Sequence, residues 1–245
     1  MTRYLLMEHY KNVLRVYNQS FKLAIITNEE AIQNGILLVG MNPSGDDGLE
    51  YYDYLNCKEK EGAKKGFWNP KHRMMGVYDK KCAYIDLFPI RNSDQKEFEK
   101  NNDTSNNMMG QLLGVTQDYI EALRPKLIIF ANATTEYYWG IKRKKDYTKN
   151  FEDGFWMDYQ FDKNVESPLN GKEDKGFWPY SKIIGINPSG VNKYRNSTNL
   201  VGTYFLKYRQ HDAKCGVVKE TRELTQEDIK TIVESIDPEW AKSLL

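Results

Sequence analysis

Short apolar runs, separated by longer segments of mixed polarity, form the main pattern along this chain. Each run is almost continuously aliphatic or aromatic, and two of them lead directly into an Asn-Pro turn. Runs of this kind are typical of strands that are buried on both faces of a parallel sheet. The sequence therefore predicts four strands, at Gly35–Val39, Lys81–Ile90, Lys126–Ala131 and Ser181–Ile186.

Three of the remaining segments have apolar residues at every third or fourth position, which is the spacing of one helical face. These segments are residues 2–24, 104–124 and 224–236. Thr225 and Asp228 have the spacing of a capping box, so we expect the third helix to begin there. Strands that alternate with helices predict an α/β fold in three layers, with helices on both faces of the sheet.

Residues 136–180 depart from this alternation. They are rich in Tyr, Trp, Phe, Lys and Gly, and we expect an irregular or hairpin insertion between the third and fourth strands. No linker or low-complexity segment divides the chain, and a length of 245 residues suits one large domain better than two. Residues 1–245 are therefore expected to form a single domain.

Composition argues against several classes of protein. No apolar stretch approaches the ~18 residues of a membrane span, and the N-terminus lacks the features of a signal peptide. We therefore expect a cytoplasmic protein with no membrane partner. The three cysteines and three histidines are far apart and lack metal-ligand spacing, so we also expect no metal, no disulfide framework and no cofactor.

A formal net charge of +1 predicts no general electrostatic attraction to polyanions. Residues 141–149 and 192–222 are locally basic, whereas residues 223–240 are acidic. A local basic face can contact phosphates, but a solvated surface is the commoner explanation of such runs. Charge alone leaves nucleic-acid binding open.

The same polar turn, Asn-Pro-Ser-Gly, follows the first and the fourth predicted strands, at residues 42–45 and 187–190. In an open α/β sheet, ligands bind beyond the carboxyl ends of the strands. We therefore expect Asn42 and Asn187 to lie in one pocket. The alternative is that both are plain turn residues, because Asn and Pro favour turns for local reasons.

These turns resemble motifs of the uracil-DNA glycosylase superfamily. Residues 40–43, Gly-Met-Asn-Pro, are similar to motif one, and the second turn is similar to motif two, as in the mismatch-specific and single-strand-selective branches. The resemblance spans roughly residues 30–200. It implies a uracil-DNA glycosylase-like fold, with a short four-stranded parallel sheet in the order 2-1-3-4. It also implies hydrolysis of the N-glycosidic bond of uracil or a related damaged or mispaired base.

The resemblance assigns roles to individual residues of a monomeric, DNA-binding enzyme. Asn42 would hold the hydrolytic water, and Asn187 would assist from the opposite wall. A base flipped out of the stack would be bound by Gly40, Met41, Pro43, Tyr54, Phe67 and Asp86. Single- or double-stranded DNA would be gripped after motif two by Ser189, Gly190, Asn192, Lys193, Tyr194 and Arg195.

Two residues depart from the family pattern. Ser44 stands where motif one usually has Gly, and Asp86 stands where the amide-reading branches carry Asn. An ionised Asp86 cannot donate a hydrogen bond to a base carbonyl, so the main alternative is a non-catalytic protein that binds a nucleotide or nucleic acid on the same fold. A hydrolase with Ser44 or Ser189 as nucleophile is a weaker alternative, because neither has a nearby His or a Gly-x-Ser-x-Gly turn. Aromatic residues such as Tyr54 and Phe67 more often belong to a core than to a stacking platform.

Overall fold

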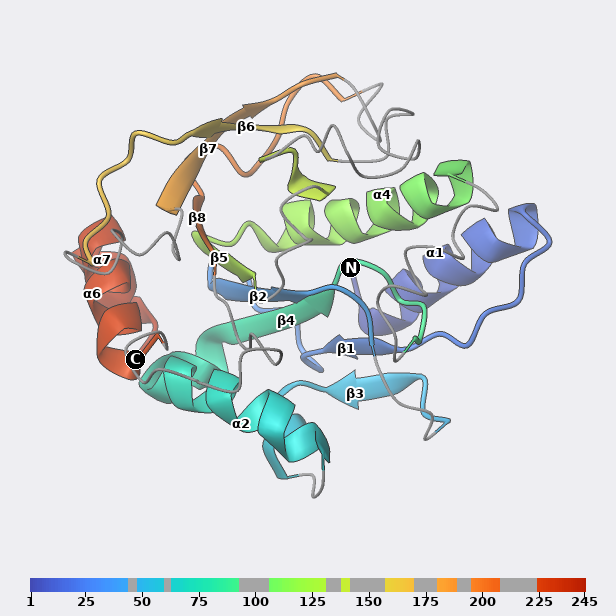
Figure 1. Cartoon of the computed structure of the whole chain (residues 1–245), viewed down its shortest axis with the longest axis horizontal. Coiled ribbons are helices and arrows are strands. Elements are labelled where there is room, and N and C mark those ends of the chain that lie inside the picture. Colours follow the sequence, from blue (N-terminus) through green and yellow to red (C-terminus); the bar gives the residue numbers. More distant parts are fainter. Residues whose placement is uncertain are drawn as a thin grey trace, which may run out of the picture.

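The computed structural model describes residues 1–43, 48–59, 63–92, 106–130, 138–141, 157–169, 180–188, 195–207 and 224–245. Within these ranges the chain is an α/β protein (Figure 1). Its helices are α1 (Arg3–Val16), η1 (Leu55–Glu59), α2 (Ala63–Met75), η2 (Gly76–Lys81), α4 (Asn106–Leu123), α6 (Gln226–Ile236) and α7 (Pro238–Ser243), where η denotes a 3-10 helix. Its strands are β1 (Ile25–Thr27), β2 (Ile36–Gly40), β3 (Tyr51–Asp53), β4 (Cys82–Asp86), β5 (Leu127–Phe130), β6 (Tyr159–Asp162), β7 (Tyr180–Ile186) and β8 (Tyr204–Lys207).

Six of these strands form one mixed sheet in the order β4-β2-β5-β8-β7-β6. β4, β2, β5 and β8 are parallel neighbours, whereas β7 is antiparallel to both β8 and β6. The predicted four-stranded parallel sheet is therefore wrong. Its first three strands are neighbours as expected, but the fourth, β7, runs in the opposite direction and is separated from β5 by β8.

β8 explains this difference. Its four residues, Tyr204–Lys207, form a run too short to stand out from the basic sequence around it. β8 nevertheless occupies the place beside β5 that β7 was expected to fill. Residues 187–203 connect β7 to β8, and their described part contains no helix. An antiparallel neighbour needs no crossover helix, so this direct connection suffices.

The described part of the insertion at residues 136–180 contributes β6 to the sheet. β6 pairs with β7 as an antiparallel neighbour, with a register shift between Gln160 and Phe161, which agrees with a hairpin. A second sheet, made of the parallel strands β1 and β3, was not predicted. Asn28, directly after β1, joins it to β4: its side-chain amide donates to the Cys82 carbonyl (3.0 Å) and accepts from the Tyr84 N–H (3.3 Å).

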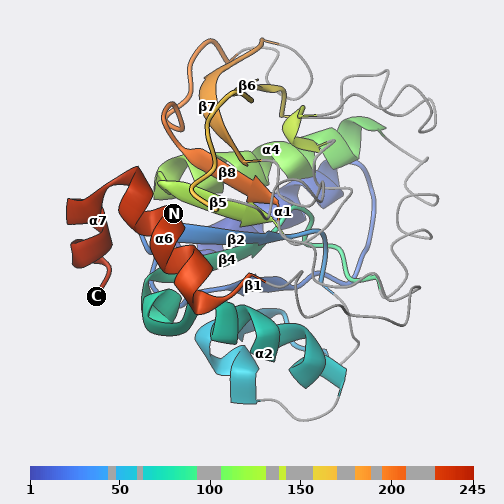
Figure 2. The ribbon, with the colours of Figure 1, turned by 60° about the vertical axis from the view of Figure 1, so that its left-hand side comes forward.

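Helices cover both faces of the large sheet, α1 and α4 on one face and α2, α6 and α7 on the other (Figure 2). Side chains alternate along a strand, so Leu37 and Val39 of β2 face α4 while Ile36 and Leu38 face α2. Because β2 is buried on both faces, its sequence is apolar at every position. The three predicted helices are confirmed as α1, α4 and α6, and α1 and α6 are shorter than the pattern suggested.

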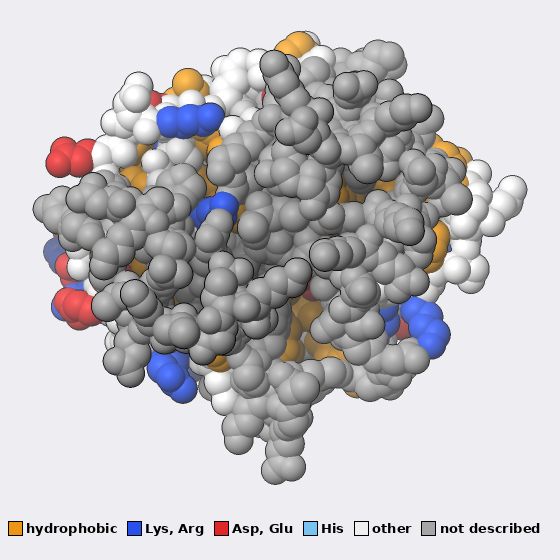
Figure 3. All heavy atoms as spheres, viewed as in Figure 1, with side chains coloured by type: hydrophobic (Ala, Val, Ile, Leu, Met, Phe, Trp, Pro, Cys, Tyr) orange, Lys and Arg blue, Asp and Glu red, His pale blue; other side chains and the backbone are white. Residues whose placement is uncertain are grey.

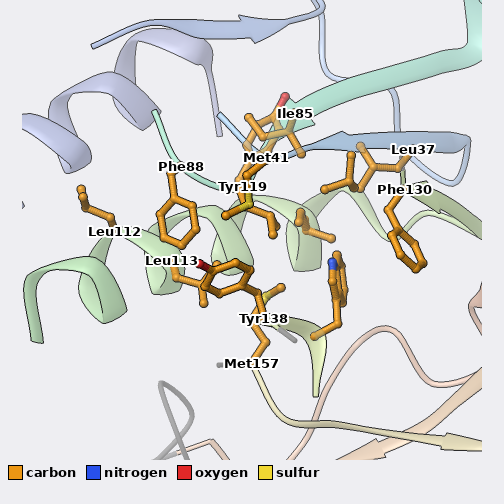
Figure 4. Packing of buried hydrophobic residues seen from close by; sticks show 14 of the residues in the cluster. Leu37, Met41, Ile85, Phe88, Leu112, Leu113, Tyr119, Phe130, Tyr138 and Met157 are labelled. Atoms are coloured by element: carbon orange, nitrogen blue, oxygen red, sulfur yellow. The ribbon is translucent and has the colours of Figure 1, made fainter. Parts of the chain in front are cut away.

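The core between the sheet and α4 fixes the carboxyl end of β4. Figure 4 shows Met41, Ile85 and Phe88 packed together with Leu112 and Tyr119 of α4. All five side chains are buried. The polar side chains of Tyr84 and Asp86 lie at the same end of the sheet, on its opposite face.

Candidate functional site

The carboxyl ends of β2 and β4 lie side by side, with Gly40 directly opposite Asp86. The space above Gly40 is filled by polar atoms of β4. A Cβ atom built on Gly40 would lie 2.1 Å from both the Asp86 Oδ1 and the Tyr84 hydroxyl oxygen. Glycine is therefore needed here so that these two side chains can fold over the end of β2.

Asp86 is a buried carboxyl group in an apolar setting. Its side chain is 4% exposed, and the Tyr84 hydroxyl donates a hydrogen bond of 2.8 Å to Oδ1. Oδ2 is buried and has no hydrogen-bond partner among the described residues. Burial raises the pKa of Asp86 to about 7, against the opposing effects of the Tyr84 hydrogen bond and the Lys71 charge. A group that titrates near neutral pH is suited to general acid–base chemistry.

Lys71 approaches this carboxyl group from α2. It is completely buried, and its Nζ lies 5.5 Å from the centroid of the Trp68 ring. Burial lowers the pKa of Lys71 to about 7, while the Asp86 carboxylate acts in the opposite direction. A buried cation and anion that both titrate near neutrality are typical of functional sites, although structural ion pairs also show such shifts.

A second polar cluster lies next to Lys71 in the sequence. His72 Nδ1 is 2.9 Å from both carboxylate oxygens of Asp79, and the Tyr54 hydroxyl donates to the same carboxylate at 2.9 Å. His72 Nε2 is buried and has no hydrogen-bond partner among the described residues. One ring nitrogen of His72 is therefore oriented by the Asp79 carboxylate, an arrangement that fixes the position of the imidazole.

The predicted stacking residue Tyr54 belongs to the core. Its ring stacks on Tyr84 with centroids 5.8 Å apart and also contacts Trp68 and His72. Because Tyr54 is fully buried, the core interpretation of this residue is the correct one. The side chain of Phe67, the other predicted ring, lies outside the described residues.

Asn42 fastens the first turn to the segment that follows β4. Its side-chain amide donates to the main-chain carbonyls of Asn92 (2.8 Å) and Ile90 (3.4 Å), and to that of Pro43 at 3.3 Å. The side chain of Met41 is buried in the α4 core. These bonds support the turn interpretation of Asn42, and its role in holding water stays a prediction.

Asn187 lies in different surroundings. Its side-chain oxygen accepts from the Gln160 amide at 2.5 Å, and its backbone N–H donates to the Asp158 carbonyl. Because β7 is antiparallel to β8, the two Asn-Pro turns follow strands that end in opposite directions. The expected common pocket of Asn42 and Asn187 is therefore not formed, and the paired turns no longer support the glycosylase resemblance.

One residue of the predicted DNA-binding loop can be placed. Arg195 forms an ion pair with Asp118 of α4, so its charge is partly compensated. The remaining predicted contacts and the two candidate serine nucleophiles lie outside the described residues: Ser44, Ser189, Gly190, Asn192, Lys193 and Tyr194.

Sequence reasoning identified Asp86 and Gly40 but missed Lys71, His72 and Asp79. A signal was present, because Trp68, Lys71, His72 and Met75 have the spacing of one helical face. Two titratable residues on an otherwise apolar face mark a buried polar site. Asp79 follows in η2, beyond the end of this helical face, and carries no comparable signal.

Comparisons with known proteins leave the family of this chain open. No family model matches it, and no curated protein matches it. Among the described residues, no group of three or more His, Cys, Asp or Glu side chains is arranged to hold a metal ion. None of the described helices has the length and apolar character needed to cross a membrane.

Proposed function

We propose that this chain hydrolyses the N-glycosidic bond of uracil or a related damaged or mispaired base, with Asp86 as the acid–base residue. The observation that carries the proposal is the buried Asp86 carboxyl group, held above Gly40 by Tyr84 with a pKa of about 7. The choice of a nucleobase rests on the resemblance of residues 40–43 to motif one. In this proposal Asp86 and Lys71 transfer the protons, and Asn42 keeps only the predicted role of holding the water.

The chemistry requires a proton acceptor and a proton donor. In its ionised form, Asp86 accepts a proton from water while the water oxygen attacks the anomeric carbon of the sugar. The C–N bond breaks, and its electron pair leaves with the base. In its ammonium form, Lys71 supplies a proton to the departing base. Groups with pKa values near 7 exchange protons readily at neutral pH.

Binding without cleavage is the second candidate function. It is favoured by the complete burial of the Asp86 Oδ2 atom, which a reacting water would have to reach. A protonated Asp86 at this position would donate a hydrogen bond to a carbonyl of a bound base. The two functions share a ligand and differ in whether a base is released.

Base release from oligonucleotides decides between them. Substrates that contain uracil, a thymine mismatch or a deaminated purine are incubated with the protein, and abasic sites are measured by strand cleavage. We expect Asp86→Asn to lower the rate of release by roughly 10²-fold or more, since loss of an acid–base group has about that effect. Asp162→Asn, a matched change at the half-exposed end of β6, should leave the rate unchanged. If the wild-type protein releases no base from any substrate but binds them, the second function replaces the first.

A further inference from the structure

A groove lined by basic residues lies beside the end of α1, away from the Asp86 cluster. It has a volume of about 600 Å³ and is bounded by α1, residues 19–23, Gly48, Glu50 and Arg91. Besides Arg91, its basic lining residues are Lys11 and Arg15 of α1 and Lys22. Figure 3 shows a small group of Lys and Arg side chains at the lower right of this face, where the segment from α1 to β1 runs in Figure 1, and further Lys and Arg side chains on its left-hand side.

The walls of the groove are tied together by backbone hydrogen bonds. The Arg91 N–H donates to the Lys22 carbonyl (2.9 Å), and the Ile25 N–H donates to the Glu50 carbonyl (2.8 Å). Glu50, the one carboxylate among the described lining residues, pairs with Lys11 at 3.0 Å. The basic side chains are therefore carried by a fixed frame.

Arg91 is held in place by a ring. Its guanidinium lies 5.2 Å from the centroid of the Tyr52 ring and donates to the Tyr52 hydroxyl at 2.5 Å. The floor beneath the basic residues is apolar, because Leu14 and Leu23 are buried and Phe21 is partly buried. Cations above an apolar floor suit a ligand with phosphates and flat rings.

The segment that carries Arg91 is hydrogen-bonded to the turn at residues 40–43. Asn92, which follows Arg91, donates its N–H to the Pro43 carbonyl (3.1 Å) and accepts the side-chain amide of Asn42 (2.8 Å). These bonds fix the position of the chain on the Arg91 side of the groove.

We infer that this groove binds the phosphates of a single nucleic-acid strand through Arg15, Lys22 and Arg91. Nucleic acid is chosen as the polyanion because of the proposed function, on which this inference rests. The groove replaces the loop at residues 189–195 as the expected site of phosphate contact.

The test is a salt titration of binding to a fluorescent single-stranded oligonucleotide, measured by anisotropy. The double variant Arg15→Gln with Lys22→Gln should make the log–log salt dependence shallower by about 1.4, since each phosphate contact on a single strand contributes ~0.7. The control is Lys230→Gln with Lys242→Gln, which removes the same charge from α6 and α7 on the other face. Its salt dependence should equal that of the wild type.

Three results would overturn the groove proposal. They are an equal change in the control variant, no binding of the oligonucleotide by the wild type at low salt, and equally tight binding of a mononucleotide or inorganic phosphate. Asp46 and Asp47 immediately precede Gly48 in the sequence, and their negative charges oppose the binding of phosphates. The titration of the wild-type protein therefore also tests whether the basic residues of the groove outweigh these charges. Base release is measured separately: strand binding without base release would contradict the proposed hydrolysis and leave the groove in place.

Discussion

Gly40 is the residue at which a single methyl group would disturb the proposed site most directly. We expect Gly40→Ala to destabilise the fold by about 1–3 kcal/mol, the usual cost of overpacking, because the new Cβ would collide with Asp86 and Tyr84. Urea unfolding measures the change. Gly114→Ala in α4 is the matched control: its Cβ meets nothing within 4 Å, so it should be neutral or stabilising by up to ~1 kcal/mol. Equal effects of the two substitutions would contradict the close approach at Gly40.

The Asp86–Lys71 pair gives stability an unusual dependence on pH. Burial raises the pKa of Asp86 from 3.8 to about 7, so its stabilising contribution is complete below pH 3.8 and is lost as the pH rises through 7. Burial lowers the pKa of Lys71 from 10.5 to about 7, so its contribution is complete above pH 10.5 and is lost as the pH falls through 7. The two contributions together are smallest near neutral pH.

Asp86→Asn should remove the part of this pH dependence of stability that comes from the Asp86 carboxyl group. The variant is expected to match the wild type near pH 4 and to exceed its free energy of unfolding by at least ~1 kcal/mol at pH 8, where the wild type holds a buried carboxylate. Unfolding in urea across this pH range measures the difference. A gain in stability that accompanies a loss of base release would mark Asp86 as a functional residue. A difference that does not change with pH would show that Asp86 is not the buried titrating group.

At the scale of elements, α6 depends on its N-cap residue, Thr225. The Thr225 side chain accepts from the Asp228 N–H (3.2 Å), and the Asp228 carboxylate accepts from the Thr225 N–H (2.7 Å). Thr225→Ala should lower the free energy of unfolding by ~1 kcal/mol, as measured by urea unfolding. The reason is that the first turn of α6, the helix that holds Ile229 and Ile232 in the core, loses its cap. Thr231→Ala, in the middle of the same helix, should lower the free energy of unfolding by less than Thr225→Ala does.

The sequence predicts elements with strong local signals and misses those without them. The capping box at Thr225 and the apolar runs of β2 and β5 are local features, and the structure confirms the corresponding helix and strands. β1, β3 and β8 have three or four residues each. Their strand character comes from the neighbours with which they pair, which no short stretch of sequence reveals.

At the scale of the whole molecule, strand direction was the feature that the sequence could not supply. The run at Ser181–Ile186 has the composition of a buried parallel strand, yet the structure places it antiparallel to β8. Composition records burial on both faces but not direction, which depends on the connections before and after the strand. The site at Gly40 and Asp86 survived this error because β2 and β4 are neighbours in both arrangements, whereas the pocket that needed Asn187 did not.

The two edges of the large sheet bear on whether copies of this chain aggregate. An exposed, regular edge strand is a template for pairing with a second molecule. Here β6 is four residues long and carries a register shift between Gln160 and Phe161, an irregularity that bends a strand and interrupts its row of donors and acceptors. At the other edge, the side chain of Asn28 already occupies the Cys82 carbonyl and the Tyr84 N–H of β4. In the described part of the chain, both edges of the large sheet thus carry an interruption, which disfavours polymerisation through this sheet.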